Sequence, residues 1–464
     1  FGLYNSTDGV VKLIAGGYFQ GSSASFRNYN KNGIESVTGG FFDCPYMDEN
    51  GRTFSDNTSI DELYYNYKPL SVTGGTFYNL GSQFDSVIGE KYVAVLGDLC
   101  EMTSYKYFNE DRLWEPSEEG AAYYYYKVVR VWEGGSDTSW YNETDTQFTL
   151  TNGDDLAGFA ELVSGGNTFK GKTVLLGESI CLNNVAWTPI GYDGNVFEGT
   201  FDGNGYVIYD LNCSCSDVSY VGLFGKLSYG IICNVTVENA TVTGKDAVGV
   251  IAGGWTGTIR NCTVRGDIYV TGNYKVGGII GDAYAKVTDC TVAGNDGSFI
   301  KGVYLETNLE GDIVGGAIGY CAEVKEEGGR IISGLQVSGV EVIGSRKVGG
   351  VVGYLHHGLD TGKILQDSSF KHGSVTIAAP QSYIDGNKEK LFVGGLVGEY
   401  DASTDNYPIT IRNCTVENVT VNGYSEALAG AIVGGTRGTY ADNLTEENNT
   451  ETNVTITYNY VVTD

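Results

Sequence analysis

Short runs of β-branched residues that alternate with polar residues recur along the middle of the chain. The phrase Ile-Arg-Asn-Cys-Thr-Val occupies 259–264 and 411–416, and the variant Val-Thr-Asp-Cys-Thr-Val occupies 287–292. Alternation with a period of two is typical of half-buried β-strands, whereas an amphipathic helix repeats every 3.6 residues. The runs are bounded by Gly or Asn, so the pattern predicts many short strands joined by tight turns.

A tetrapeptide of glycine, two apolar residues and a small residue falls between these runs. A unit this short cannot bury its apolar face alone, but equivalent strands stacked about 4.8 Å apart form parallel sheets around one continuous core. Antiparallel hairpin signals are scarce, so a sandwich or propeller is disfavoured. We predict an all-β fold, a right-handed parallel β-helix, with the glycines at positive-φ corners or at close approaches between coils. The copies begin at Gly222, Gly249, Gly278, Gly316, Gly350, Gly395 and, more weakly, Gly430.

One column of the repeated strand phrase contains cysteine. Cys262, Cys290 and Cys414 occupy the position that Val235 and Leu335 fill in other repeats. A column of Val, Leu and Cys predicts buried thiols that pack as small apolar side chains, with stacked disulfides as the alternative. None of the ten cysteines has zinc-site spacing. Pairing in an oxidising compartment stays open for Cys213, Cys215 and Cys233.

Two segments precede the repeats. A capping residue, Asn152 or Asp154, followed by Leu156, Phe159, Ala160 and Val163 on one face predicts a short helix over 152–163. Such a helix would shield the first coil from strand pairing with other chains.

The phrase Phe-Glu-Gly-Thr-Phe-Asp-Gly-Asn-Gly at 197–205 is the second of these segments. Its Asp202 and Asn204 are turn-forming residues whose side chains can cap backbone groups. A calcium or sugar contact at the same two residues is the alternative.

With these motifs, residues from about 148 to 440 resemble the GLUG-motif repeat region of bacterial cell-surface, adhesin-like proteins. The resemblance implies a β-solenoid in an extracellular structural or adhesive protein. The first 145 or so residues resemble a different repeat, because Gly-Gly-x-Phe recurs at 16–19, 39–42 and 74–77. That phrase also predicts solenoid coils, each with an aromatic residue stacked inward.

The chain therefore divides into four expected parts. Residues 1–97 carry the Gly-Gly-x-Phe coils, and 98–147 form an aromatic-rich insertion or junction. Residues 148–438 form the GLUG-type solenoid, and 439–464 contain a polar linker and a terminal strand. That strand, at 454–462, either pairs within its own chain or is donated to a neighbouring subunit.

Composition narrows the location and the partners. The formal net charge is −28, which disfavours nucleic-acid binding and association with anionic membranes. The chain begins at Phe1, and no stretch is apolar and long enough to span a bilayer, which fits a processed or excised segment of an exported protein. We expect an extracellular or cell-surface location.

Glycosylation sequons, Asn-x-Ser/Thr, are dense in the sequence. Several belong to the repeated strand phrase, where Asn and Thr also suit turns and strands, so a glycoprotein and a purely structural role are both open. The candidate N-glycosylation sites are Asn5, Asn57, Asn142, Asn212, Asn234, Asn239, Asn261, Asn413, Asn418, Asn443, Asn448 and Asn453.

No catalytic constellation stands out from the 57 acidic residues. The pair His356-His357, with Asp360 nearby, is a candidate metal site, but an exposed loop pair without further ligands is more often inert. We expect no enzyme activity, no cofactor and no metal. The expected function is a surface stalk or adhesin whose partners are other copies of itself, joined as a filament, or glycans on a cell surface. The alternative is a β-helix protein that binds or cleaves polysaccharides.

Overall fold

The structure is a computed structural model that divides into two compact units, residues 1–131 and 132–464. No helix among the residues it describes is both long and apolar enough to cross a membrane. The described residues are 3–5, 11–15, 18–20, 24–28, 34–38, 41–43, 58–61, 71–72, 76–78, 91–101, 106–108, 114–116, 122–305, 311–322, 331–356, 363–401, 409–425, 428–437, 444–458 and 460–463.

Unit 1 begins with nine short strands that pair in parallel. Strands β3, β6 and β9 carry the three Gly-Gly-x-Phe phrases and are successive neighbours, with Phe19 beside Phe42 and Phe42 beside Phe77. That these rings point inward stays a prediction, because their side chains lie outside the described part of the structure. The nine strands are β1 (Leu3–Asn5), β2 (Val11–Ile14), β3 (Tyr18–Gln20), β4 (Ala24–Asn28), β5 (Ile34–Val37), β6 (Phe41–Asp43), β7 (Thr58–Asp61), β8 (Ser71–Val72) and β9 (Thr76–Tyr78).

Antiparallel strands follow in unit 1. Strand β10 (Tyr92–Glu101) pairs with β13 (Ala122–Arg130), and β11 (Lys106–Phe108) pairs with β12 (Trp114–Pro116). The expected boundary at 97/98 thus lies within β10.

The division between the units lies at 131/132, within the expected segment 98–147. Trp132 belongs to unit 2 because its buried ring packs edge-on against Trp187, with the ring centroids 5.6 Å apart. Strand β14 (Gln147–Leu150) then pairs with β15 (Thr173–Leu176), so residues 132–147 lead directly into the solenoid.

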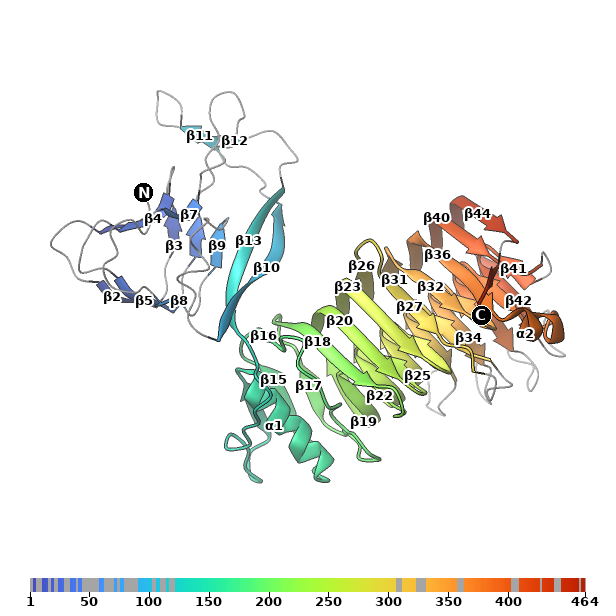
Figure 1. Ribbon diagram of the computed structural model, residues 1–464, viewed down its shortest axis with the longest axis horizontal. Coiled ribbons are helices and arrows are strands. Elements are labelled where there is room, and N and C mark those ends of the chain that lie inside the picture. Colours follow the sequence, from blue (N-terminus) through green and yellow to red (C-terminus); the bar gives the residue numbers. More distant parts are fainter. Residues whose placement is uncertain are drawn as a thin grey trace. The chain divides into compact units, whose positions relative to one another are not determined.

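Strands of unit 2 form three parallel sheets among the described residues (Figure 1). The first sheet contains β14, β15, β17 (Thr200–Asp202), β19 (Phe224–Cys233), β22 (Ala252–Arg260), β25 (Ile280–Thr288), β29 (Ile318–Cys321), β30 (Ile331–Ser333), β34 (Val352–His356), β35 (Lys363–Gln366), β38 (Val397–Asp401), β39 (Ile409–Arg412), β42 (Val433–Arg437) and β43 (Leu444–Glu447). The second contains β16 (Ile180–Cys181), β18 (Val207–Cys215), β20 (Thr236–Gly244), β23 (Thr263–Gly272), β26 (Thr291–Gly294), β27 (Phe299–Gly302), β31 (Gln336–Ser338), β32 (Glu341–Gly344), β36 (Ser369–Ala379), β40 (Thr415–Asn422), β44 (Thr450–Thr457) and β45 (Val461–Val462). The third contains β21 (Val248–Gly249), β24 (Lys275–Gly277), β28 (Ile313–Gly315), β33 (Lys347–Gly349), β37 (Phe392–Gly394) and β41 (Ala429–Gly430).

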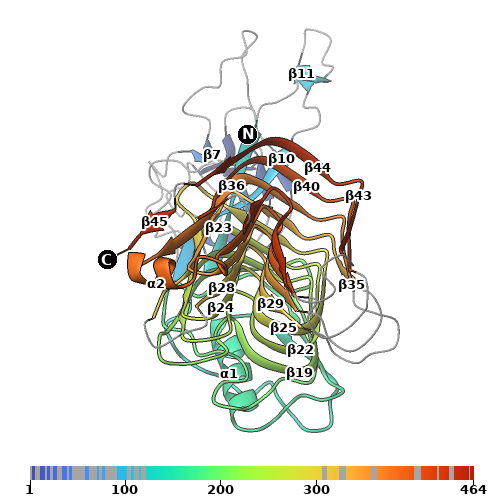
Figure 2. The same ribbon diagram turned by 90° about the vertical axis from the view of Figure 1, so that its right-hand side faces the viewer.

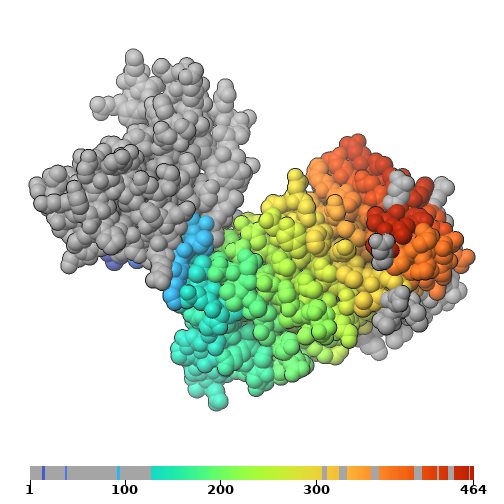
Figure 3. All heavy atoms as spheres, viewed as in Figure 1, coloured from blue at the N-terminus to red at the C-terminus, as the bar shows by residue number. Residues whose placement is uncertain are grey.

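From β21 to β42, each coil of unit 2 passes through the three sheets in turn, and the next coil pairs with it in parallel (Figure 2). Identical columns line the interior, so that Val237, Val264 and Val292 are register partners in successive coils and all are buried. One continuous core follows from this stacking. Figure 3 shows that the colours, and therefore the coils, follow one another in chain order along the surface of unit 2. The predicted all-β parallel β-helix is confirmed.

Helix α1 (Gly153–Ser164) lies at the N-terminal end of the stack (Figure 1). Asn152 caps it by accepting hydrogen bonds from the backbone N–H groups of Asp154 and Asp155. The side chains of Leu156, Phe159, Ala160 and Val163 are buried against the core, as predicted. The Asp155 carboxylate stabilises the start of the helix, because it accepts a hydrogen bond from the backbone N–H of Thr151 at 2.8 Å.

The C-terminal residues form a further coil of the same solenoid. Strand β43 pairs with β39, β44 pairs with β40, and β45 pairs with β36, all in parallel. The expected boundary at 438/439 therefore separates one coil from the next and not a solenoid from a linker. Of the two alternatives for the terminal strand, the structure shows pairing within the same chain, between β44 and β40. A second helix, α2 (Gln381–Gly386), precedes β37.

Candidate functional site at the glycine corner

The repeated glycine tetrapeptide makes the turn between the third and first sheets, which we call the glycine corner. A Cβ atom on Gly316 would lie 2.0 Å from the carbonyl oxygen of Gly350, and one on Gly350 would lie 2.1 Å from that of Gly395. Real Cβ atoms do not approach so closely, so these positions must be glycine. Of the two roles predicted for these glycines, close approach between coils is confirmed, since none of the three has a positive φ.

The corner brings together side chains seven residues apart. Lys275 lies just before it and Asp282 just after it, and the Lys275 Nζ and Asp282 Oδ2 atoms form an ion pair at 2.7 Å. Lys347 forms the equivalent contact with the next coil, with its Nζ 2.7 Å from Glu399 Oε2. The side chains of Lys347 and Glu399 are only 7% and 0% exposed.

Burial shifts the pKa values of these groups. Burial raises the pKa of the Asp282 carboxyl, although Lys275 opposes the shift. Burial lowers the pKa of the Lys347 ammonium, although Glu399 opposes that shift. In both cases the low-polarity surroundings disfavour the charged form, and the ion pair restores part of the cost.

Tyrosine rings of successive coils pack in tilted pairs beside the ion pairs. The ring centroids of Tyr284 and Tyr320 are 6.1 Å apart, and those of Tyr320 and Tyr354 are 5.5 Å apart. Lys347 Nζ lies 3.3 Å from the centroid of the Tyr354 ring, a cation–π contact. The Tyr354 hydroxyl donates a hydrogen bond to Asp401 Oδ2, and burial together with this bond raises the pKa of Tyr354. In this cluster, Lys275 and Asp282 pair within one coil, whereas Lys347 with Glu399 and Tyr354 with Asp401 join neighbouring coils.

A pocket of about 390 Å³ lies where the corner begins, before the first third-sheet strand. Tyr192, Asp193, Asp217, Tyr220 and Lys226 contribute to its lining. Burial, and then the carboxylates of Asp282 and Asp246, raise the pKa of the Tyr220 hydroxyl, so this group stays protonated at neutral pH.

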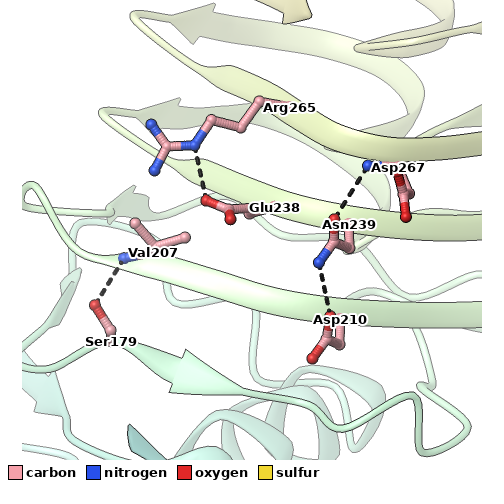
Figure 4. Close-up of polar contacts among 7 residues, drawn as sticks. All are labelled: Ser179, Val207, Asp210, Glu238, Asn239, Arg265 and Asp267. Atoms are coloured by element: carbon pink, nitrogen blue, oxygen red, sulfur yellow. Dashed lines mark hydrogen bonds and ion pairs between the residues drawn. The ribbon is translucent and has the colours of Figure 1, made fainter. Parts of the chain in front are cut away.

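Asparagine and aspartate side chains form hydrogen-bonded ladders at the other turns. Asn239 Nδ2 donates to Asp210 Oδ1 at 3.0 Å, and Asn239 Oδ1 accepts from the backbone N–H of Asp267 at 3.0 Å (Figure 4). Arg265 and Glu238 form an ion pair beside this ladder, at 2.8 Å (Figure 4). The ladders join successive coils, because each amide contacts the coil before it.

The ladders include most of the candidate glycosylation sites. Seven sequon asparagines adopt φ between 52° and 59°, the left-handed conformation that Asn tolerates better than most residues. Asn142 and Asn212 donate through Nδ2 to Asp145 and to the Asn184 carbonyl. Glycosylation stays a prediction at all twelve sites; Asn57, Asn443 and the Asn5 side chain lie outside the described residues. The seven are Asn234, Asn239, Asn261, Asn413, Asn418, Asn448 and Asn453.

The turn residues of the phrase at 197–205 cap backbone groups as predicted. Asp202 Oδ1 accepts from the backbone N–H of Asn204 at 2.8 Å, and Asn204 Nδ2 donates to the Leu176 carbonyl at 3.1 Å. Asp202 also accepts from Asn234 Nδ2 at 2.9 Å. Within the part of the chain that the structure describes, no three His, Cys, Asp or Glu side chains are grouped to hold a metal ion.

The cysteine column is buried, as predicted. Cys262, Cys290 and Cys414 are at most 1% exposed and have free thiols. Each thiol donates to the carbonyl two residues earlier, at 3.2–3.4 Å. Cys213, Cys215 and Cys233 also have free thiols in the structure.

The histidine pair is only partly described. His356 ends β34, and its ring stacks on that of Tyr320 with centroids 5.9 Å apart. His357 and Asp360 lie outside the described residues, so the geometry of the candidate metal site is not part of the structure.

Sequence reasoning missed the corner ion pairs and the pocket. A signal was present for one pair, because Lys-Val-Gly-Gly at 275–278 is followed by Asp282, seven residues after the lysine, whereas the same phrase at 347–350 is followed by Tyr354 at that spacing. Nothing in the sequence pattern singled out Lys226 or Trp255 of the pocket region.

Comparison with known proteins gives local similarities. No protein-family model matches the chain. Halomucin from Haloquadratum walsbyi is 44% identical over 77 residues, which is 16% of this chain and 1% of halomucin. A protein provisionally named a Gly-rich membrane protein, from Evansella cellulosilytica, is 39% identical over 82 residues, 17% of this chain and 10% of that protein.

One solved structure is also similar to this chain. It is a protein from Bacteroides ovatus provisionally named an immunoglobulin A1 protease, with 20% sequence identity and a TM-score of 0.42. The similarity covers 68% of this chain and 79% of that one. The chain thus spans only small parts of the curated relatives that it matches, and it is similar to segments of them.

Proposed function

We propose that this chain is a non-enzymatic structural module of an extracellular surface protein, in which the solenoid is a stiff spacer with a lateral binding face. The observation that carries the proposal is the glycine corner, where Lys347 and Glu399, at most 7% exposed, pair between adjacent coils, while Lys275 and Asp282 pair within one coil. A general acid or base must reach a substrate, whereas Lys347 and Glu399 are buried and connect two coils. Such connections stiffen a stack in which each coil contacts only its neighbours.

The surface location has separate support. The net charge of −28 favours solubility in an exposed setting, and one relative with local similarity is named a membrane protein. The GLUG-type repeats that the sequence resembles belong to bacterial cell-surface proteins. The glycoprotein character proposed from the sequons fits the same location.

We expect an antibody against this chain to label intact cells of its source as strongly as permeabilised cells. The purified chain, incubated with a panel of neutral and acidic polysaccharides, is expected to release neither reducing ends nor unsaturated sugars. Labelling only after permeabilisation would contradict the surface location. Cleavage products that disappear with heat-denatured protein would contradict the non-enzymatic part and favour the polysaccharide-cleaving alternative.

Self-association is a second candidate function, favoured by the last coil. Strand β44 pairs on one side with β40, and among the described residues no strand pairs with its other side. Ile456, Tyr458, Val461 and Val462 are 38–52% exposed at this end. An open strand edge with apolar side chains is a template for pairing with another chain, whereas α1 covers the core at the opposite end. We therefore propose pairing between the C-terminal coils of two copies, in preference to strand donation.

Ile456→Lys is expected to abolish concentration-dependent dimerisation in size-exclusion chromatography with light scattering, because a buried lysine in the edge contact is unfavourable. Gln147→Lys, an exposed position on the first strand β14, is the matched control and should leave the dimer intact. Equal loss in both variants, together with fibres in negative-stain microscopy, would instead support a head-to-tail filament. A wild-type chain that stays monomeric at all concentrations would contradict self-association.

A further inference from the structure

Three aromatic residues of neighbouring coils adopt backbone conformations that bulky side chains rarely adopt. The φ angles are 64° at Tyr220, 57° at Tyr229 and 101° at Trp255. Most other positive-φ residues of the chain are Asn, Asp or Gly, which tolerate this region. Strain of this kind persists only where the surrounding structure enforces it, and it is concentrated at functional sites.

Two of these aromatic residues lie at an irregularity of the first sheet. The register between β19 and β22 shifts between Ser228 and Gly230, at Tyr229, and Trp255 is the register partner of Leu227 just before the shift. Tyr229 is 66% exposed and Trp255 is 40% exposed, so the irregularity turns large rings toward solvent. Bulges commonly re-aim side chains next to binding sites.

Lys226 connects Trp255 to the pocket. Its Nζ atom lies 3.6 Å from the centroid of the Trp255 ring and 5.3 Å from that of Tyr220, and Lys226 also lines the pocket. Among the ion pairs of the described residues, none involves Lys226, unlike Lys275 and Lys347 at later corners. Its ammonium group is therefore held by rings alone and can donate to a ligand.

The pocket combines flat rings with hydrogen-bonding groups. Tyr192 and Tyr220 bring aromatic rings to its lining, Asp193 and Asp217 bring carboxylates that can accept hydrogen bonds, and Lys226 brings an ammonium donor. Pyranose sugars present apolar C–H faces and a rim of hydroxyls, which match rings and carboxylates respectively. The volume of about 390 Å³ is near the lower end of the roughly 300–1,000 Å³ of small-molecule sites.

The charges select among sugars. Two carboxylates and one ammonium line the pocket, and the whole chain has a net charge of −28. Both the local and the overall charge repel sugars that carry carboxylate or sulfate groups. Neutral sugars avoid this repulsion, and their hydroxyls can donate to Asp193 and Asp217.

We propose that the pocket formed by Tyr192, Asp193, Asp217, Tyr220 and Lys226, with Trp255 beside it, binds a neutral hexopyranose unit of a surface polysaccharide. This inference rests on the proposed surface function, to which it adds a ligand class and a site. Tyr192 and Tyr220 stack on the sugar ring, the carboxylates accept from its hydroxyls, and Lys226 donates to one of its oxygens. Trp255 is a positioning residue that holds the Lys226 ammonium.

The test is calorimetric titration of the full chain with four neutral hexasaccharides, cello-, manno-, malto- and galactohexaose, and with hexagalacturonate as the anionic comparison. At least one neutral hexasaccharide is expected to bind. Tyr220→Ala is expected to weaken that binding about tenfold or more, the change that 1.4 kcal/mol produces. Tyr269→Ala removes a half-buried ring, as Tyr220 is, from β23 of the second sheet, outside the pocket lining, and should leave the affinity unchanged.

Lys226→Met keeps the apolar stem of the side chain and is the second variant, in case Tyr220→Ala does not fold. It should weaken binding while the circular dichroism spectrum stays that of the wild type. Binding of hexagalacturonate alone, no binding of any neutral hexasaccharide, or unchanged binding in both variants would overturn the proposal. Each of these results leaves the labelling of intact cells unaffected, so failure of the site and failure of the surface function are distinguishable.

Discussion

Gly350→Ala is expected to lower the free energy of unfolding of the solenoid by roughly 3 kcal/mol or more. The new Cβ would lie 2.1 Å from the carbonyl oxygen of Gly395 and 2.4 Å from Cδ1 of the Phe370 ring. The backbone of the next coil cannot retreat without breaking the parallel ladder between β33 and β37. Chemical denaturation followed by far-ultraviolet circular dichroism measures the loss.

Gly386→Ala is the matched control. A Cβ at this position meets nothing within 4 Å, and Gly386 has no positive φ, so the change should stay within about 0.5 kcal/mol. Similar losses in the two variants would show that the corner glycines are not required by close approach between coils.

Lys347→Met is expected to destabilise the protein by roughly 3–5 kcal/mol at neutral pH, because Glu399 would remain buried and charged after losing its 2.7 Å ion pair. The pKa of the Glu399 carboxyl would then rise above its value in the unfolded chain. Stability of the variant should therefore recover as the pH falls through that raised pKa, where the carboxyl is protonated. Denaturation curves between pH 4 and 8 measure both effects.

The double variant Lys347→Met/Glu399→Gln should recover most of the lost stability, because no unpaired charge remains. Lys388→Met is the control for losing a lysine, since the Lys388–Asp385 pair is at least half exposed on both sides and should contribute little. A loss for Lys347→Met that is independent of pH and persists in the double variant would contradict the ion-pair explanation.

Much of the candidate site could not be predicted from the sequence, and the reason is geometric. The lysine-containing phrases at 275–278 and 347–350 are visible in the sequence, but their partners differ. Lys275 pairs with Asp282 of its own coil, whereas Lys347 pairs with Glu399, 52 positions later. Which partner is reached depends on coil lengths that vary from repeat to repeat, and on side-chain directions that only the folded corner defines.

The sequence by itself determined the strands, the stacking and the first cap. A period of two with a recurring glycine phrase leaves a parallel solenoid as the arrangement that buries every apolar face. The cap was narrowed to Asn152 or Asp154 and the cysteine column to buried positions, because capping chemistry and column composition are local properties. Only the tertiary structure decided the rest. In the structure, the strands after residue 438 form another coil, and sequon asparagines form ladders between coils. Lys226 lies against Trp255 beside an open pocket. These contacts join residues of different coils, and they depend on backbone irregularities such as the positive φ of Trp255, which alternation of apolar and polar residues does not encode.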